Sequence, residues 1–156
     1  PRDSEATRDG AEWSRYDAAT SGYKERVHFF ELLGDAEHQT HVLLRNAESS
    51  RGVSLHYDIT QLPCFAQWKH TGSLEDGYVT GLEPATNFPN PRSFEADRGR
   101  VVPLAAGASR QFDLRLHYHA HSESVATAQR AIEGLAAGTK PLVHPQPRAD
   151  WSFEGS

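Results

Sequence analysis

A carboxylate stands at the end of an expected strand in the segment Gly81-Leu82-Glu83-Pro84-Ala85-Thr86-Asn87, directly before a loop stiffened by further prolines. A carboxylate held between a strand and a proline loses little conformational entropy when it meets a ligand, so Glu83 can act as a positioned general base. Asn87 lies in the loop that can hold the same ligand. The alternative is structural: Glu83 merely caps the edge of a sheet, and the Asn87 side chain hydrogen-bonds to the backbone of the loop. Carboxylates at strand ends are common, which favours this alternative for Glu83.

A second group of residues has the spacing of possible metal ligands. His117, His119 and His121 follow one another at every second position, which places them on one face of an extended strand. Successive residues on one face are about 6.5–7 Å apart, which is awkward for three ligands that must each approach an ion to about 2.1 Å. We therefore expect no metal and no cofactor, and we keep a metal-dependent jelly-roll enzyme as an alternative.

Short alternating segments separated by turn residues determine the expected fold. We predict strands at 27–32, 40–46, 53–57, 64–69, 77–82, 100–104 and 110–118, with a loop over residues 84–97. Residues 122–137 have the apolar spacing of a helix, with Val125, Ala128, Ile132 and Leu135 on one stripe. The pattern predicts an all-β fold, namely an antiparallel β-sandwich or part of one, with one C-terminal helix.

Chain length, charge and residue counts exclude several classes of protein and of partner. The 156 residues suffice for one domain, and 16 Lys and Arg against 21 Asp and Glu give a net charge of −5 with no basic cluster, so we expect no nucleic-acid partner. No apolar run reaches the ~18 residues of a membrane span, so we expect no membrane partner.

The single cysteine, Cys64, favours a reducing, cytoplasmic location and is expected to be a small buried side chain. The absence of methionine predicts an N-terminally shortened protein.

Several motifs together resemble the C-terminal end of the aldose 1-epimerases, also called galactose mutarotases. The resemblance rests on the segment 81–87, on Val102-Pro103-Leu104-Ala105-Ala106-Gly107 and on the alternating strand that ends at Tyr118. Weaker matches lie upstream, at Gly22-Tyr23-Lys24-Glu25, Leu55-His56-Tyr57-Asp58, Leu62-Pro63-Cys64-Phe65 and Gln67-Trp68-Lys69. The resemblance implies a galactose mutarotase-like sandwich, of which residues 23–138 form a part. Residues 1–22 are then an irregular lead-in and residues 139–156 an extended tail.

The resemblance also implies a reaction and its residues. Glu83 takes the position of the catalytic base, which removes the proton of the anomeric hydroxyl while an acid protonates the ring oxygen. Trp68 offers an aromatic platform for a sugar or sugar derivative, and Gln67 and Lys69 offer polar contacts, with Lys69 favouring an anionic sugar unless it is merely a solvated strand residue. Glu25 falls near the family's acidic ligand of a sugar hydroxyl, although a surface charge is the simpler interpretation.

Two departures from the family limit what the resemblance implies. Complete epimerase domains are much longer, and none of the nine histidines stands in the family's H-x-Y-x-N context, so no residue inherits the role of the acid. We therefore expect either a missing N-terminal half of the sandwich or self-association to cover the open strand edges. The alternative function is a carbohydrate-binding β-sandwich without catalysis.

Overall fold

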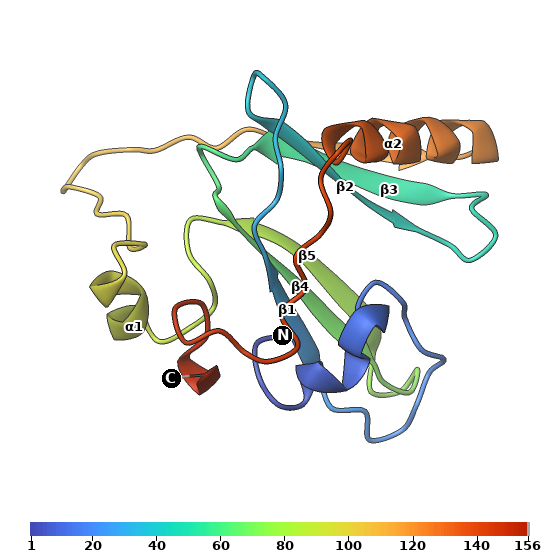
Figure 1. Ribbon diagram of the computed structural model, residues 1–156, viewed down its shortest axis with the longest axis horizontal. Coiled ribbons are helices and arrows are strands. Elements are labelled where there is room, and N and C mark those ends of the chain that lie inside the picture. Colours follow the sequence, from blue (N-terminus) through green and yellow to red (C-terminus); the bar gives the residue numbers. More distant parts are fainter. Residues whose placement is uncertain (156) are drawn as a thin grey trace. The chain divides into compact units, whose positions relative to one another are not determined.

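The structure is a computed structural model that describes residues 1–155. Figure 1 shows its elements, which in chain order are η1 (Ala6–Glu12), β1 (Arg26–Phe30), β2 (Gln39–Arg45), β3 (Gly52–Asp58), β4 (Cys64–Thr71), β5 (Tyr78–Ala85), α1 (Arg92–Asp97), β6 (Leu114–His119), α2 (Ser122–Leu135) and η2 (Phe153–Gly155). The chain forms two compact units. Unit 1 contains Pro1–Glu31, Cys64–Pro103 and the chain from Leu142 onward, and unit 2 contains Leu32–Pro63 and Leu104–Pro141.

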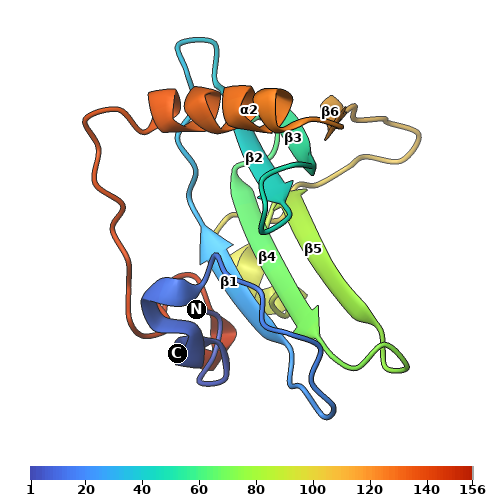
Figure 2. The same ribbon diagram turned by 90° about the vertical axis from the view of Figure 1, so that its right-hand side faces the viewer.

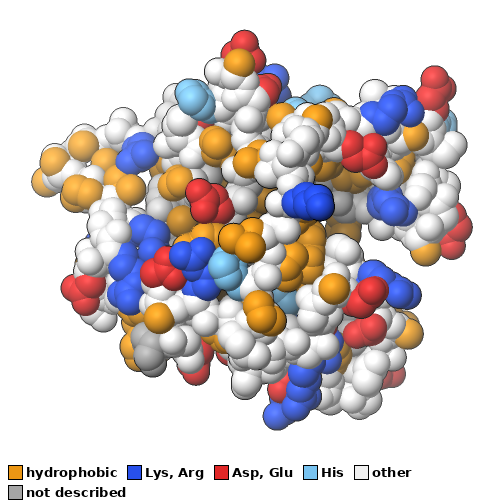
Figure 3. All heavy atoms as spheres, viewed as in Figure 1, with side chains coloured by type: hydrophobic (Ala, Val, Ile, Leu, Met, Phe, Trp, Pro, Cys, Tyr) orange, Lys and Arg blue, Asp and Glu red, His pale blue; other side chains and the backbone are white. Residues whose placement is uncertain are grey.

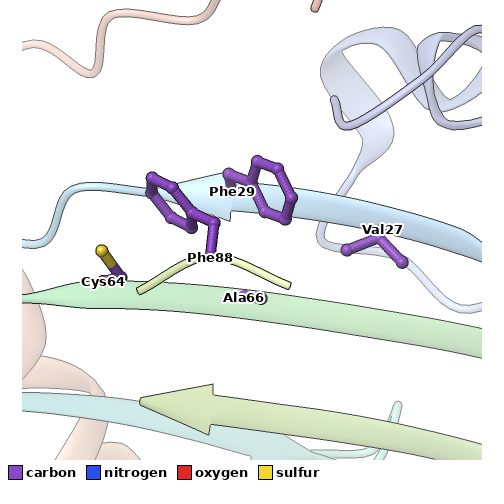
Figure 4. Close-up of a cluster of buried hydrophobic side chains, with 5 residues drawn as sticks. All are labelled: Val27, Phe29, Cys64, Ala66 and Phe88. Atoms are coloured by element: carbon purple, nitrogen blue, oxygen red, sulfur yellow. The ribbon is translucent and has the colours of Figure 1, made fainter. Parts of the chain in front are cut away.

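Unit 1 is built on a three-stranded antiparallel sheet in the order β1-β4-β5, which Figure 2 shows with β4 in the middle. Because side chains alternate along a strand, one face of this sheet gathers the apolar residues of every second position. Val27, Phe29, Cys64 and Ala66 form a buried cluster there with Phe88 from the following loop (Figure 4). The rings of Phe29 and Phe88 are stacked with their centroids 4.5 Å apart. This cluster fixes β1 and β4 against the loop that follows β5.

The opposite face of the same sheet contains a buried ionic cluster. Asp9, which lies in η1, bonds Lys69 Nζ at 2.7 Å and His28 Nε2 at 2.9 Å, and it also pairs with Arg26. Burial alone raises the pKa of the Asp9 carboxyl, but the hydrogen bonds from Lys69, His28 and Arg26 outweigh it and hold the pKa below its ordinary value. The expected irregular lead-in thus contains a 3-10 helix that is anchored to the sheet.

The segment after β5 differs from the prediction of a loop followed by a strand. Residues 92–97 form α1, and the buried Glu95 carboxylate accepts hydrogen bonds from Phe88 N, Asn90 Nδ2 and Arg100. Arg100 donates through both Nε and Nη2, at 2.6 and 2.7 Å. The predicted strand at 100–104 is wrong, because Arg100 is turned to Glu95 and Pro103 has no N–H to donate to a ladder.

Unit 2 contains the second antiparallel sheet, in the order β2-β3-β6, and α2 lies against β2. The predicted helix over 122–137 is confirmed by α2, which ends two residues earlier, at Leu135. Its apolar stripe is turned inward, since Val125 is fully buried and Ala128, Ile132 and Leu135 are partly buried. The last strand begins at Leu114 rather than at Arg110. An all-β fold was predicted, and the two antiparallel sheets with few helices show a mostly-β fold.

Apolar and charged side chains are mixed on the molecular face seen in Figure 3. None of the helices within residues 1–155 has the length and apolar character that a membrane span requires.

Candidate functional site

Glu83 projects from β5, the edge strand of the unit 1 sheet. The register pairs Glu83 with Ala66 and Gly81 with Trp68, so Glu83 and Trp68 lie on one face. Trp68 also packs against the buried apolar cluster. Glu83 is exposed and Trp68 is half-buried. The structure therefore brings together the expected base and the expected aromatic platform.

A second carboxylate is held close to this pair. Trp68 Nε1 donates a hydrogen bond to Glu25 Oε2 at 2.8 Å, and Arg2 Nη2 donates to Glu25 Oε1 at 3.2 Å. Although much of the Glu83 residue is exposed, partial desolvation of its carboxyl and then the negative charge of Glu25 raise the pKa of that carboxyl above its ordinary value. A carboxylate with a raised pKa is a stronger base.

Gln67 and Lys69 do not join this site, because the neighbours of Trp68 on a strand point to the opposite face. Lys69 is fully buried there with Asp9, and its Nζ also donates to Trp13 O at 3.1 Å. Gln67 is buried and donates from Nε2 to Tyr16 OH at 3.0 Å. Both side chains hold residues 1–22, here called the N-terminal segment, against the sheet. Lys69 therefore gives no reason to expect an anionic ligand.

Asn87 also has its side chain engaged within its own loop. Its Nδ2 donates to Phe88 O at 2.7 Å, and its Oδ1 accepts from Thr86 Oγ1 at 3.3 Å. These bonds match the structural alternative for Asn87. Its contribution to the site is therefore the shape of the loop that follows β5.

Two residues of this site were missed in the sequence. His70 lies on the same face as Trp68, and the two rings are nearly parallel, at 15° with their centroids 6.1 Å apart. The spacing of two residues between Trp68 and His70 was a usable signal for this shared face. Arg2 had no such signal, because 23 residues separate it from Glu25.

Cys64 and the three spaced histidines lie outside the group formed by Glu83, Trp68 and Glu25. Burial raises the pKa of Cys64 to about 11, and its thiol belongs to the apolar cluster, as expected of a structural cysteine. Of the three spaced histidines only His117 and His119 lie on β6, while His121 precedes α2. Within residues 1–155, no group of three or more His, Cys, Asp and Glu side chains has an arrangement that can hold a metal ion.

Unit 2 instead contains a hydrogen-bonded histidine network across its three strands. His41 Nδ1 lies 2.5 Å from His56 Nδ1, and Ser54 Oγ lies 2.9 Å from His56 Nε2 and 2.8 Å from His119 Nε2. Burial, followed by the neighbouring charges of His41, His117, His119 and Arg115, lowers the pKa of His56 to about 4. The native network thus holds His56 neutral.

Acidification should therefore destabilise this unit. The pKa of His56 falls from 6.5 to about 4 on folding. Between these two pH values the unfolded state takes up a proton on His56 that the folded state does not. The stability of the fold is therefore unaffected by His56 above pH 6.5 and decreases as the pH falls toward 4. After allowance for solvent screening we expect a loss of roughly 1–3 kcal/mol in the free energy of unfolding, measured by urea denaturation at pH 7 and pH 4.5. His56→Gln should weaken this dependence and His121→Gln should not; an unchanged dependence in His56→Gln would contradict the assignment.

Comparisons with known proteins place the chain among its relatives. It is similar to a crystal structure described as "a putative aldose 1-epimerase" from Klebsiella pneumoniae, with 34% sequence identity and a TM-score of 0.85 over 90% of this chain and 36% of that one. The chain thus spans about a third of that protein, and the similarity supports a galactose mutarotase-like fold. No curated protein matches the sequence significantly. Residues 1–118 match the family described as Domain of unknown function (DUF4432), and the chain belongs to that family.

Proposed function

We propose that this chain carries the base-bearing part of a sugar isomerase site, which interconverts the anomers of an aldose or sugar derivative by ring opening. In this proposal its two sheets are part of a larger galactose mutarotase-like β-sandwich. The observation that supports it best is the Glu83 carboxylate on the same face as Trp68, whose pKa is raised by partial desolvation of the carboxyl and by Glu25. The similarity to the Klebsiella protein gives the reaction class.

The chemistry assigned to Glu83 is a proton transfer. The carboxylate removes the proton of the anomeric hydroxyl, the carbonyl bond forms at C1, and the bond from C1 to the ring oxygen breaks as an acid protonates that oxygen. Rotation of the aldehyde about the C1–C2 bond and closure by the reverse steps give the other anomer. The reaction is redox-neutral, and we assign the acid to no residue of this chain.

Trp68 and Glu25 supply the contacts for the sugar in this proposal. The half-buried indole presents an aromatic surface on which the C–H face of a sugar can pack. The Glu25 carboxylate is fixed by Trp68 and Arg2 and can accept a hydrogen bond from a sugar hydroxyl. Fixing the acceptor before the ligand arrives lowers the entropy cost of binding.

Exchange between anomers can be measured directly by two-dimensional NMR with glucose and galactose. We expect the full product of the gene to accelerate the exchange, and the 156-residue chain to be strongly impaired if the acid lies outside it. Sugar binding without acceleration by the full product would overturn the isomerase and support a carbohydrate-binding protein. Absence of both binding and acceleration would overturn both proposals.

A further inference from the structure

The Glu83 side chain folds back along its own strand. Gly81 and Glu83 share a face of β5, being two residues apart. An ideal Cβ placed on Gly81 would lie 2.2 Å from Glu83 Oε1, 2.9 Å from its Cδ and 3.1 Å from its Cγ. The carboxylate therefore occupies the space that any side chain at Gly81 would need.

Nothing in the backbone of Gly81 calls for glycine. Gly81 is not among the glycines of the described chain that have a positive φ, such as Gly77 and Gly99. It lies inside β5, where glycine weakens a strand because it has no side chain to pack and loses more entropy on folding. Glycine within a strand often marks a place where another group approaches closely, and here that group is the end of the Glu83 side chain.

The register explains why this location suits a catalytic carboxylate. Gly81 pairs with Trp68 of β4, whose indole N–H holds Glu25. A carboxylate that lies over Gly81 is thus in the cross-strand row of Trp68 rather than in its own row, opposite Ala66. The fold-back moves Glu83 toward the aromatic platform and the second carboxylate.

We propose that Gly81 is a positioning residue, whose missing side chain provides the space in which the Glu83 carboxylate is held beside Trp68. The proposal rests on the proposed function only in naming Glu83 as the base. A side chain at residue 81 then drives the carboxylate out of this space by rotation of the Glu83 side chain. Because the three nearest atoms to the added Cβ all belong to the Glu83 side chain, β5 need not move.

Gly81→Ala tests this positioning without requiring activity. The matched control is Gly134→Ala in α2, where an added Cβ has no atom within 4 Å. In the 156-residue chain, the carboxyl carbon of Glu83 is titrated by NMR, and thermal unfolding is recorded. We expect Gly81→Ala to move the pKa of Glu83 toward its ordinary value with Tm unchanged or higher, and Gly134→Ala to leave that pKa alone. An unchanged pKa of Glu83 in Gly81→Ala would overturn the proposal.

Activity of the full gene product then separates the inference from the proposed function. We expect Gly81→Ala to lower kcat for anomer exchange by ~10- to 100-fold with little change in KM, because a misplaced base is ineffective. A shifted pKa in a protein that never accelerates exchange would support the positioning and reject the isomerase. An active protein whose kcat and pKa are untouched by Gly81→Ala would reject the positioning alone.

A double-mutant cycle covers the case in which Gly81→Ala lowers Tm. Glu83→Ala removes the atoms that an added Cβ would meet. The loss of Tm caused by Gly81→Ala should then disappear in the Glu83→Ala background. A loss that persists there would overturn the proposal, because it would place the conflict elsewhere.

Discussion

Replacing Glu83 with glutamine should lower the rate of anomer exchange by the full gene product by about 10²–10⁴-fold, with little change in its melting temperature. Glutamine keeps the size of the side chain but cannot accept the proton of the anomeric hydroxyl. The exposed Glu83 is not a member of the buried ion pairs that hold unit 1 together, so the fold should persist. Exchange NMR and thermal unfolding measure the two effects.

The matched control is Glu75→Gln, which changes an exposed glutamate in the turn before β5 and should leave the rate unchanged. The pH dependence adds a second test, because the base acts only when deprotonated. Since the pKa of Glu83 is raised, the rate should fall on acidification at a higher pH than an ordinary glutamate would give, and Glu25→Gln should move this fall to lower pH. Full activity in Glu83→Gln would remove the base assignment.

Replacing Asp9 with alanine should lower the free energy of unfolding by about 3–5 kcal/mol, because it leaves the buried Lys69 ammonium without a counter-ion. Lys69 is fully buried and has its ammonium 2.7 Å from Asp9 Oδ2. Arg26 also pairs with this carboxylate, and His28 hydrogen-bonds to it. Urea denaturation monitored by tryptophan fluorescence measures the loss.

Two further variants separate the ionic cluster from general damage to the fold. Asp97→Ala removes an exposed carboxylate in α1 and should change the stability by less than about 0.5 kcal/mol. Adding Lys69→Met to Asp9→Ala should recover part of the loss, since it removes the uncompensated buried charge. A cost for Asp9→Ala no larger than that of Asp97→Ala would show that the cluster does not anchor the N-terminal segment.

The local features of the fold were predictable because they depend on local periodicity. The alternation of residues 40–46 and 53–57 and the apolar stripe of 122–137 correspond to β2, β3 and α2. The helix α1 is not predicted, because the prolines before it exclude regular strand pairing and thereby indicate a loop over residues 84–97. Pro91 precedes its first residue, where a missing N–H costs nothing.

The candidate site was predictable only in part. The period of a strand already separates Gln67 and Lys69 from Trp68, so their grouping with Trp68 neglected information that the sequence contained. The pairing of Lys69 with Asp9 spans 60 residues, and no local pattern marks a charged residue that will be buried by a distant partner. The fold-back of Glu83 over Gly81 could not be predicted, because the sequence does not show the side-chain conformation of Glu83. A glycine inside a strand indicates only a weakened strand until the group that approaches it is known.

The alternation of β4 makes one strand serve two purposes that can be altered separately. Trp68 and His70 lie on the face of the candidate site, where Ala66 belongs to the buried apolar cluster, while Gln67, Lys69 and Thr71 lie on the opposite face. A library that randomises only position 70 should therefore change ligand preference while most members keep the buried ionic cluster and the apolar cluster. Randomising 67 and 69 should instead yield mainly poorly folded proteins, so the even and odd positions of this strand form separate targets for protein engineering.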